Sequence, residues 1–336
     1  MRSGKTGTAR TGVVTVAVVG YAFAMVLVAA AVLTTGDSNA LGMLLLFGPR
    51  WLLVFPWLLL VPLAFMKSKG LVITALVGAV VTLFYVSGFE VPVPSALKGG
   101  AGAGKALRVV TYNTDGSTSL ASRIDTDMLA WNADVIVMQD CAPQVAAAMQ
   151  EAASVPRVPY QVYVASEFCV ATRLALRAPV RVEGSRKEGR ALGFSVAWQG
   201  TTVSVGTVHL PSPRSALWAA RKGSGDLLEE SVQQRADASV AIASWLLANQ
   251  RNPVIVGGDF NLPAESKALR RDWGSLRNAF SEAGWGFGHT MFAGRHRVRI
   301  DHVLVSREFT VRGARVLSGF PSEHQPVVAE LEIMRR

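Results

Sequence analysis

The chain has 336 residues, half of them apolar, and a formal net charge of +10. Seven basic and two acidic residues lie in the first 100 positions, and 27 basic and 22 acidic residues follow. The second part is therefore only mildly basic, which argues against a nucleic-acid-binding protein. The composition changes along the chain and predicts a membrane anchor over residues 1–90, a linker over 91–106 and a globular domain over 107–336.

Three apolar stretches near the N-terminus have about the length that a membrane-spanning helix needs: Val13–Leu33, Trp51–Met66 and Gly70–Phe89. The middle stretch is shorter, but the side chain of Arg50 in front of it can extend to the lipid headgroups. A signal peptide that is cleaved near Ala40 is the alternative interpretation of the first stretch. The sequence thus predicts a bundle of three transmembrane helices.

Basic residues are distributed unevenly on the two sides of these stretches. Only Arg50 and Lys98 flank one side, whereas the other side has Arg2, Lys5, Arg10, Lys67 and Lys69. Basic flanks favour the cytoplasmic side. We therefore expect a multi-pass protein of the cell membrane whose globular domain is extracellular.

Residues 91–106 contain the Gly- and Ala-rich segment SALKGGAGAGKA, which is typical of a flexible linker. Beyond it, short Val-rich runs predict strands at Leu107–Tyr112, Asp134–Met138, Phe168–Ala171, Gly193–Trp198, Thr202–His209, Pro253–Gly257, Arg299–Val305 and Pro326–Leu331. Helices are predicted at Thr126–Trp131, at Pro143–Ala152 and, behind a Ser cap, at Ser231–Ala248. This order favours an α/β sandwich with helices outside two packed sheets.

The two cysteines, Cys141 and Cys169, are too few for a disulfide framework. An extracellular location would permit one disulfide bond between them. Two unpaired cysteines in the core are the alternative.

Six short polar motifs interrupt the ends of the predicted strands: YNTDG (112–116), QD (139–140), HL (209–210), GGDFNLP (257–263), RIDH (299–302) and SEH (322–324). Any one of them could be an ordinary turn, but their clustering indicates a site. Hard oxygen ligands for a metal ion are available at Asn113, Asp115, Asp140 and Glu323. Oxygen ligands favour Mg²⁺, with Mn²⁺ as the second choice, over zinc.

The remaining polar residues suggest catalytic groups. Asp259 and Asn261 follow an apolar run and should emerge together at a sheet edge. Asp301 and His324 could pair, with the carboxylate holding one imidazole nitrogen, although a surface histidine is the alternative. His209 ends a strand and is either a site residue or a loop histidine. We interpret His289, His296 and His302 as structural.

Taken in order, the six motifs resemble those of the endonuclease/exonuclease/phosphatase superfamily, and the similarity runs from about Leu107 to Glu332. The resemblance implies a four-layered α/β sandwich like that of deoxyribonuclease I, and a metal-dependent phosphoric ester or pyrophosphate hydrolase. It also implies roles for nine residues. Metal ligands would be Asn113, Asp115, Asp140 and Glu323, and catalytic residues would be Asp259, Asn261, His324, His209 and Asp301.

Within the resemblance, Asp259 would orient or deprotonate the attacking water and Asn261 would contact the phosphate. His324, paired with Asp301, would stabilise the charge of the transition state, and His209 would help to protonate the leaving group. Two positions depart from the usual pattern: Gln-Glu is replaced by Gln139-Asp140, and Ser-Asp-His by the sequence SEH at 322–324. Charge is kept at both, but the reach of the carboxylate changes, which could alter the preference for a metal.

Three spans followed by this domain also resemble the VanJ-type membrane proteins associated with teicoplanin resistance. This implies a membrane lipid or polyprenyl-phosphate substrate, such as undecaprenyl pyrophosphate, and a role in recycling cell-wall lipid. A membrane-anchored nuclease, a phospholipase-like phosphodiesterase and a non-catalytic sensor of wall precursors are the alternatives. The segment 212–230 is either an exposed loop or a surface for an anionic interface, because it contains Arg214, Trp218, Arg221 and Lys222.

Overall fold

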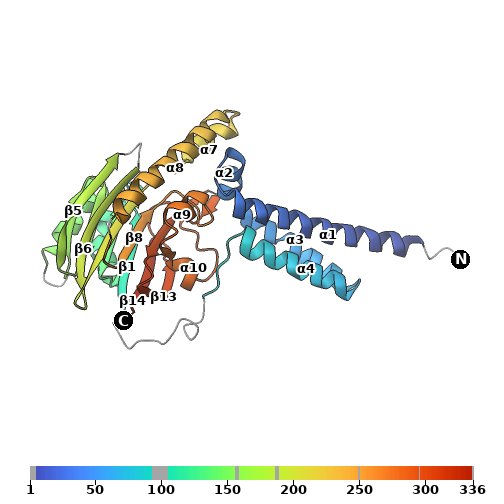
Figure 1. The fold of residues 1–336 in the computed structure, drawn as a ribbon, viewed down its shortest axis with the longest axis horizontal. Coiled ribbons are helices and arrows are strands. Elements are labelled where there is room, and N and C mark those ends of the chain that lie inside the picture. Colours follow the sequence, from blue (N-terminus) through green and yellow to red (C-terminus); the bar gives the residue numbers. More distant parts are fainter. Residues whose placement is uncertain are drawn as a thin grey trace.

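The computed structural model describes residues 5–92, 105–155, 159–185, 189–248, 250–294 and 296–334. Within these ranges, the side chains of residues 5–11, 178–182 and 185 are not described. Figure 1 shows an elongated bundle of helices that projects from one side of a globular α/β domain. Most of the predicted linker, residues 93–104, lies outside the described residues.

The bundle begins with the long helix α1 (Lys5–Thr34). After it come α2 (Ala40–Phe47), a 3-10 turn η1 (Arg50–Val54), α3 (Pro56–Phe65), α4 (Lys69–Val81) and a π-helical turn η2 (Thr82–Val86). The helices α1, α3 and α4 pack together through small side chains and Trp57. Gly78 allows this approach, since a Cβ atom there would lie 2.4 Å from the ring of Trp57.

Two helices are long and apolar enough to cross a membrane: Gly12–Thr34 and Lys69–Val86. They correspond to the first and third predicted spans. The second predicted span falls on the second arm of a bent pair, Ala40–Phe47 and Arg50–Phe65, whose axes differ by 74°. The break is at Gly48 and Pro49, and a proline there cannot continue the hydrogen bonding of a helix. The bundle thus has two candidate spans, or three if the bent pair counts as one.

The globular domain contains two six-stranded sheets. The first has the order β13-β14-β1-β2-β4-β3, with β1 (Leu107–Asn113), β2 (Val135–Gln139), β3 (Gln161–Ala165), β4 (Phe168–Thr172), β13 (Phe309–Val316) and β14 (Val327–Ile333). The second has the order β5-β6-β7-β8-β12-β9, with β5 (Leu176–Ser185), β6 (Gly189–Trp198), β7 (Thr201–His209), β8 (Val254–Asp259), β9 (Arg277–Asn278) and β12 (Asp301–Val305). A short hairpin, β10 (Met291–Ala293) and β11 (His296–Val298), stands apart from both.

Helices cover the outer face of each sheet. The first sheet packs against η4 (Thr118–Ser122), α5 (Ile124–Trp131) and α6 (Pro143–Ala153), and the second packs against α8 (Asp226–Leu247) and α9 (Lys267–Asp272). Between the sheets lies a core of strand residues such as Val109, Val137, Phe194 and Ile255. This arrangement is the predicted α/β sandwich. Two shorter helices, α7 (Arg214–Arg221) and α10 (Ala279–Ala283), complete the domain.

The eight predicted strands correspond to β1, β2, β4, β6, β7, β8, β12 and β14, with ends that differ by up to four residues. The prediction of a Ser cap at Ser231 was wrong, because α8 begins at Asp226 and Ser231 is buried within it. The segment 212–230, considered as a possible exposed loop, instead forms α7 and the start of α8. Strands with mixed exposure, such as β3 and β13, were not predicted.

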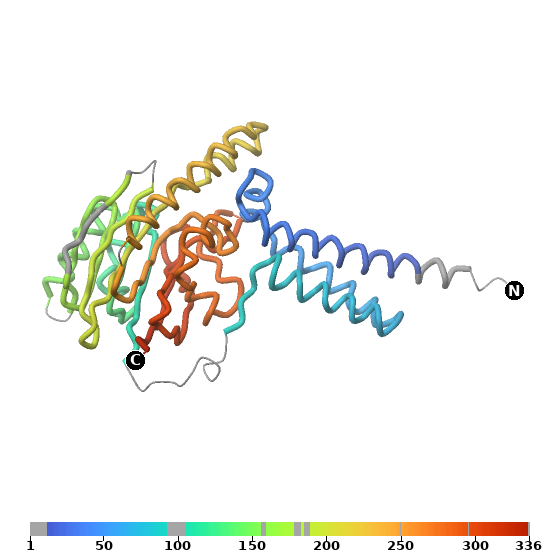
Figure 2. Tube along the Cα trace, in the orientation of Figure 1, coloured from blue at the N-terminus to red at the C-terminus, as the bar shows by residue number. Residues whose placement is uncertain are grey.

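The bundle contacts the globular domain directly, in addition to the linker. Asp37 is 4% exposed and accepts hydrogen bonds from Arg235 (2.6 Å) and from the Ser266 hydroxyl (2.8 Å). Arg50 forms an ion pair with Glu265 at 3.0 Å, and Arg299 pairs with Glu90 at 2.9 Å. The contacts are made by the segment between α1 and α2, by the start of η1 and by the segment after η2. Figure 2 shows that this end of the bundle lies next to the globular domain. Breaking such buried pairs is costly, so the anchor should keep a fixed position.

Candidate active site

The polar motifs come together because strands from both sheets end at the same edge. The parallel strands β1 and β2 place Asn113 opposite Gln139, and the parallel strands β7 and β8 place His209 opposite Asp259. The antiparallel strand β12 begins at the same edge, with Asp301 opposite Asp259. Close packing of β8 depends on the Gly pair in its motif, since a Cβ atom on Gly258 would lie 2.2 Å from a backbone oxygen of β7.

A cavity of about 860 Å³ opens at this edge. Eight of the nine predicted site residues line it: Asn113, Asp115, Asp140, His209, Asp259, Asn261, Glu323 and His324. The ninth, Asp301, lies behind His324 and hydrogen-bonds its Nδ1 atom. The tertiary structure therefore gathers every predicted residue in one place.

Asp259 occupies the centre of the site and is 1% exposed. Its Oδ1 accepts from the backbone N–H of Asn261 (2.9 Å), and its Oδ2 accepts from the side-chain amide of Asn113 (2.8 Å). Burial, together with the charge of Asp301, raises the pKa of Asp259, and His324 and His209 partly offset that rise. A buried carboxylate with a raised pKa is a suitable proton acceptor.

Two imidazoles lie near this carboxylate. The Nε2 atom of His324 is 3.9 Å from Asp259 Oδ2, and the Nε2 atom of His209 is 3.8 Å from the same oxygen. His324 Nδ1 is bonded to Asp301 at 2.9 Å. Burial alone would lower the pKa of His324, but the charges of Asp301 and Asp259 raise it to about 9. His324 is therefore a cation at neutral pH.

The second imidazole has a partner that the sequence did not suggest. His209 Nδ1 is 2.8 Å from Glu167, which lies in the turn between β3 and β4 and is 7% exposed. Arg190 donates to the other oxygen of Glu167 at 3.0 Å. Burial lowers the pKa of His209, but the hydrogen bond with Glu167 and the charge of Asp259 raise it above its ordinary value. No motif surrounds Glu167, so only its burial beside a polar cavity identifies it.

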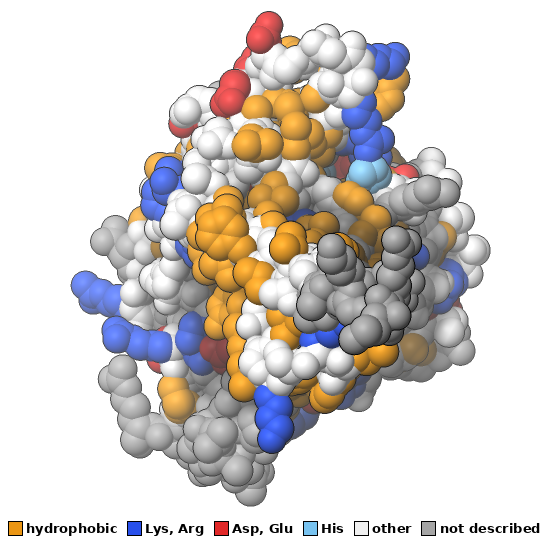
Figure 3. All heavy atoms as spheres, turned by 90° about the vertical axis from the view of Figure 1, so that its right-hand side faces the viewer, with side chains coloured by type: hydrophobic (Ala, Val, Ile, Leu, Met, Phe, Trp, Pro, Cys, Tyr) orange, Lys and Arg blue, Asp and Glu red, His pale blue; other side chains and the backbone are white. Residues whose placement is uncertain are grey.

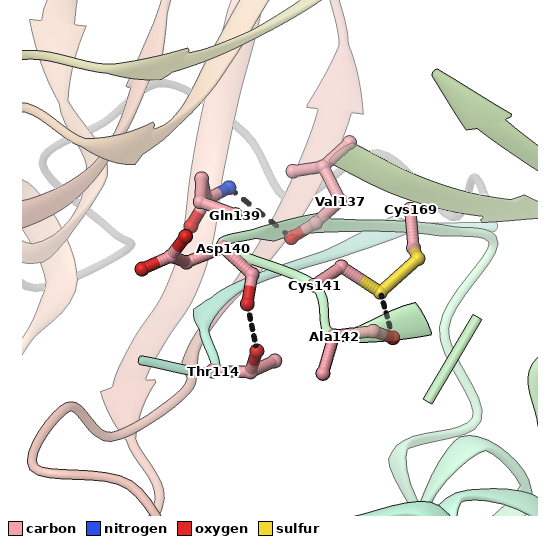
Figure 4. The surroundings of a disulfide bond; sticks show 7 residues. All are labelled: Thr114, Val137, Gln139, Asp140, Cys141, Ala142 and Cys169. Carbon is pink, nitrogen blue, oxygen red and sulfur yellow. Dashed lines mark hydrogen bonds between the residues drawn. A yellow bond between two sulfur atoms is a disulfide. The ribbon is translucent and has the colours of Figure 1, made fainter. Parts of the chain in front are cut away.

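Asp140 follows β2 in the left-handed conformation, with a φ of 49°. The hydroxyl of Thr114 donates to its backbone carbonyl at 2.6 Å. The next residue, Cys141, forms a disulfide bond with Cys169, so the first of the two alternatives for the cysteines is confirmed. Figure 4 shows that the side chain of Asp140 points away from the disulfide. The disulfide thus fixes the backbone behind a cavity-lining carboxylate.

The donor set tests whether a metal ion fits here. Ligand atoms of Asp140, Glu167 and His209 lie within 4.8 Å of one another, and so do those of Asp259, Asp301 and His324. Carboxylate oxygens predominate in both groups, which suits a hard divalent cation such as Mg²⁺ or Mn²⁺. The residues present therefore fit a divalent metal.

Asn113, Asp115 and Glu323 also line the cavity, and the carboxylates of Asp115 and Glu323 lie outside these two groups of acidic and His side chains. Asn113 uses its side chain to bond Asp259 and the backbone N–H of Asp115. Asp115 is exposed at the rim. Glu323 forms an ion pair with Arg214 of α7, and both side chains are exposed.

The histidines interpreted as structural differ in their surroundings. His302 is buried, accepts from Asn278 and donates to the carbonyl of Leu262, and burial lowers its pKa to about 4. His289 stacks on Phe287, and its pKa also falls to about 4 through burial and nearby arginines. Both lie outside the cavity, whereas His296 lines its far rim and contacts Arg221.

A buried carboxylate near two oriented imidazoles, with groups of side chains that could hold a divalent cation, suits the hydrolysis of a phosphate ester. Residues 110–324 match the Endonuclease/Exonuclease/phosphatase family, and the chain belongs to that family. Its members are phosphoesterases, which makes this protein a hydrolase. A comparison with curated proteins found no match.

Solved structures share the fold at low sequence identity. TDP2 of D. rerio, complexed with a single-strand DNA product, is 13% identical with a TM-score of 0.52, and the match covers 68% of this chain and 100% of that one. A mannosyl-6-phosphatase of Bacteroides thetaiotaomicron is 16% identical with a TM-score of 0.51, covering 68% and 100%. TDP2 of Caenorhabditis elegans is 18% identical with a TM-score of 0.52, covering 67% and 97%. These likenesses concern the globular domain and its fold alone.

Proposed function

We propose that this protein is a membrane-anchored, divalent-metal-dependent phosphohydrolase that acts at the outer face of the cell membrane on a lipid-linked phosphate or pyrophosphate. Undecaprenyl pyrophosphate is the substrate of choice, with a role in recycling cell-wall lipid and in resistance to teicoplanin, as in VanJ-type proteins. One observation carries the proposal. The cavity that contains Asp259, His209 and His324 is also lined by Leu44 and Phe47 of α2, which belongs to the anchor.

The proposed topology counts the bent pair of helices as a third span. The first residues of α1 and the turn between α3 and α4, which contains Lys67, lie at the end of the bundle remote from the globular domain (Figure 1). Basic residues at that end favour a cytoplasmic location for it. The globular domain would then be extracellular, where a disulfide bond between Cys141 and Cys169 is stable.

In the proposed mechanism, Asp259 orients the attacking water and accepts its proton. His324, which Asp301 keeps charged and fixed, donates to an equatorial oxygen of the phosphate as negative charge develops there. A divalent ion held by Asp140 would supply further neutralisation of that charge. Asn261 positions the phosphate, and His209, oriented by Glu167, protonates the leaving oxygen.

The test is release of phosphate by the full-length protein in detergent, with Mg²⁺ or Mn²⁺, from undecaprenyl pyrophosphate, a phospholipid and DNA. We expect metal-dependent release from the polyprenyl substrate that is lost in Asp259→Ala and in His324→Ala. Cleavage of DNA alone would favour an anchored nuclease, and cleavage of the phospholipid alone a phosphodiesterase. Failure on all three substrates with the fold intact would favour a sensor of wall precursors.

A further inference from the structure

One face of α7 covers the catalytic cavity. Five of its residues line the cavity, and four of them are spaced at i, i+3, i+4 and i+7: Arg214, Leu217, Trp218 and Arg221. This spacing places them in one stripe of the helix. The stripe is basic at the catalytic end, where Arg214 pairs with Glu323, apolar in the middle, and basic again at Arg221.

The anchor also contributes to the lining of the cavity. Leu44 and Phe47 of α2 line it, as do Met291 and Ile300 of the globular domain. Leu44 is 44% exposed and Trp218 is 59% exposed, although both are large apolar side chains. In Figure 3, hydrophobic side chains gather in the middle of the face that carries the anchor, and Lys and Arg side chains lie toward its edge.

Buried contacts fix this wall in place. Arg235 of α8 forms an ion pair with Asp37 just before α2, and its guanidinium lies 5.2 Å from the centre of the Phe47 ring. The side chain of Asn39 caps α2 by accepting from the N–H of Gly42 at 2.8 Å. Met43 and Leu46 of α2 share a core with Ala216 of α7. The gap between α2 and α7 is therefore a built feature of the fold.

We propose that the hydrocarbon chain of the substrate lies in this gap, between Leu44 and Phe47 on α2 and Leu217 and Trp218 on α7. The phosphate would reach Asp259 past Arg214, and the chain would continue toward the bilayer along the anchor. This inference rests on the proposed function and deepens it, because it assigns the part of the protein that selects a long chain.

Size and charge favour a lipid phosphate as the occupant. A cavity of about 860 Å³ is within the range that encloses a ligand of many atoms, which exceeds the needs of a phosphate group. An anionic head matches Arg214 and the metal site, and a hydrocarbon chain matches the apolar lining residues Leu44, Phe47, Leu217 and Trp218. Covering exposed Leu44 and Trp218 with a chain removes apolar surface from water.

The chain offers a matched pair of exposed tryptophans for the test. Trp218 lines the cavity, whereas Trp285 is 69% exposed and packs near Phe89 at the junction with the anchor. With a C55 polyprenyl pyrophosphate, we expect Trp218→Ala and Leu44→Ser to raise KM by about tenfold, the loss expected when one large apolar contact is removed. With the C15 compound farnesyl pyrophosphate the rise should be smaller, and kcat should stay within about twofold for both substrates. Trp285→Ala should leave both parameters unchanged.

The inference would be overturned if Trp218→Ala raised KM equally for the C55 and C15 substrates. It would also be overturned if Trp285→Ala raised KM as much as Trp218→Ala. A binding measurement separates its failure from that of the proposed function. A long-chain alkyl phosphate with a nitroxide on its chain should quench tryptophan fluorescence in the Asp259→Ala protein, and this quenching should be reduced by Trp218→Phe but not by Trp285→Phe. Such quenching without hydrolysis in the wild type would support the chain site and overturn the proposed reaction. Hydrolysis without any contribution of Trp218 to the quenching would support the proposed reaction and overturn the chain site.

Discussion

The two carboxylate–imidazole pairs of the site, Asp301 with His324 and Glu167 with His209, face the same oxygen of Asp259 at nearly equal distances. The two pairs differ in the exposure of the imidazole and in the number of groups that the carboxylate contacts. Asp301 contacts His324 with both oxygens, and the His324 side chain is 6% exposed. Glu167 is shared between His209 and Arg190, and the His209 side chain is 19% exposed.

This difference suggests distinct tasks for two similar pairs. A buried imidazole with an undivided carboxylate stays charged and fixed, as a group that stabilises developing charge must. An imidazole at the cavity wall, whose carboxylate is shared with an arginine, exchanges its proton more readily, as a general acid must. Substitutions in each pair can test whether His324 stabilises charge and His209 donates a proton.

The largest effect should come from the group that both pairs serve. Asp259→Asn removes the proton acceptor and should lower kcat by roughly 10²- to 10⁴-fold. The measurement is phosphate release at saturating metal and substrate. Asp237→Asn, at an exposed position on α8, is the matched control and should keep wild-type activity. Comparable loss in that control would indicate a general defect.

The second-largest decrease in kcat should follow the removal of the charged imidazole of His324. His324→Gln should lower kcat by roughly 10²- to 10³-fold with little change in KM, because its interaction strengthens only in the transition state. His209→Gln should lower kcat less with a substrate that has a good leaving group, such as a nitrophenyl phosphate, than with a substrate that has a poor one. Equal dependence of both variants on the leaving group would contradict the assigned roles.

The partner carboxylates should have smaller effects. Asp301→Asn and Glu167→Gln remove groups that orient the imidazoles, and losses of roughly 10- to 100-fold are expected for such partners. We expect the Asp301 variant to behave like a weakened His324 variant, and the Glu167 variant to follow the leaving-group pattern of His209. If Glu167→Gln were silent, the second pair would be structural.

Titration separates the pairs without turnover. In the metal-free protein, the pKa of His324 is raised to about 9. An imidazole is protonated below its pKa, so His324 should lose its proton only as the pH rises through about 9. Asp301→Asn removes a charge that favours the cation and should bring the titration to a lower pH. NMR of ¹³C-labelled histidine in detergent would follow it. If the midpoint of the His324 titration were unchanged in Asp301→Asn, the charge of Asp301 would not be the cause of the raised pKa.

The smallest effect on activity should come from the disulfide, which lies beside only one of the pairs. Cys141→Ser with Cys169→Ser opens a loop of 28 residues and should lower the free energy of unfolding by roughly 3 to 4 kcal/mol. Activity at moderate temperature should fall only a few-fold, because Asp140 points away from the bond. Thermal unfolding with and without reductant measures the first effect. Abolished activity with an unchanged melting temperature would mean that the disulfide acts on the site itself.

The sequence by itself determined eight strands of the two sheets, the apolar anchor and nine polar residues, eight of which line one cavity. These features are local: apolar runs predict buried strands, and polar residues at their ends predict a site at the sheet edge. Edge strands such as β3 carry a weaker pattern, because one face meets solvent. They could not be recognised in the same way.

Only the tertiary structure decided which groups become partners. Glu167 reaches His209 from 42 residues away, Glu323 turns to Arg214 from 109 residues away, and α2 folds back to wall the cavity. Side-chain reach and the bend at Gly48 and Pro49 set these contacts, and neither leaves a periodic pattern in the sequence. Ion pairs between segments distant in sequence form only once packing has brought the segments together, so the join between anchor and active site was not predictable from the chain alone.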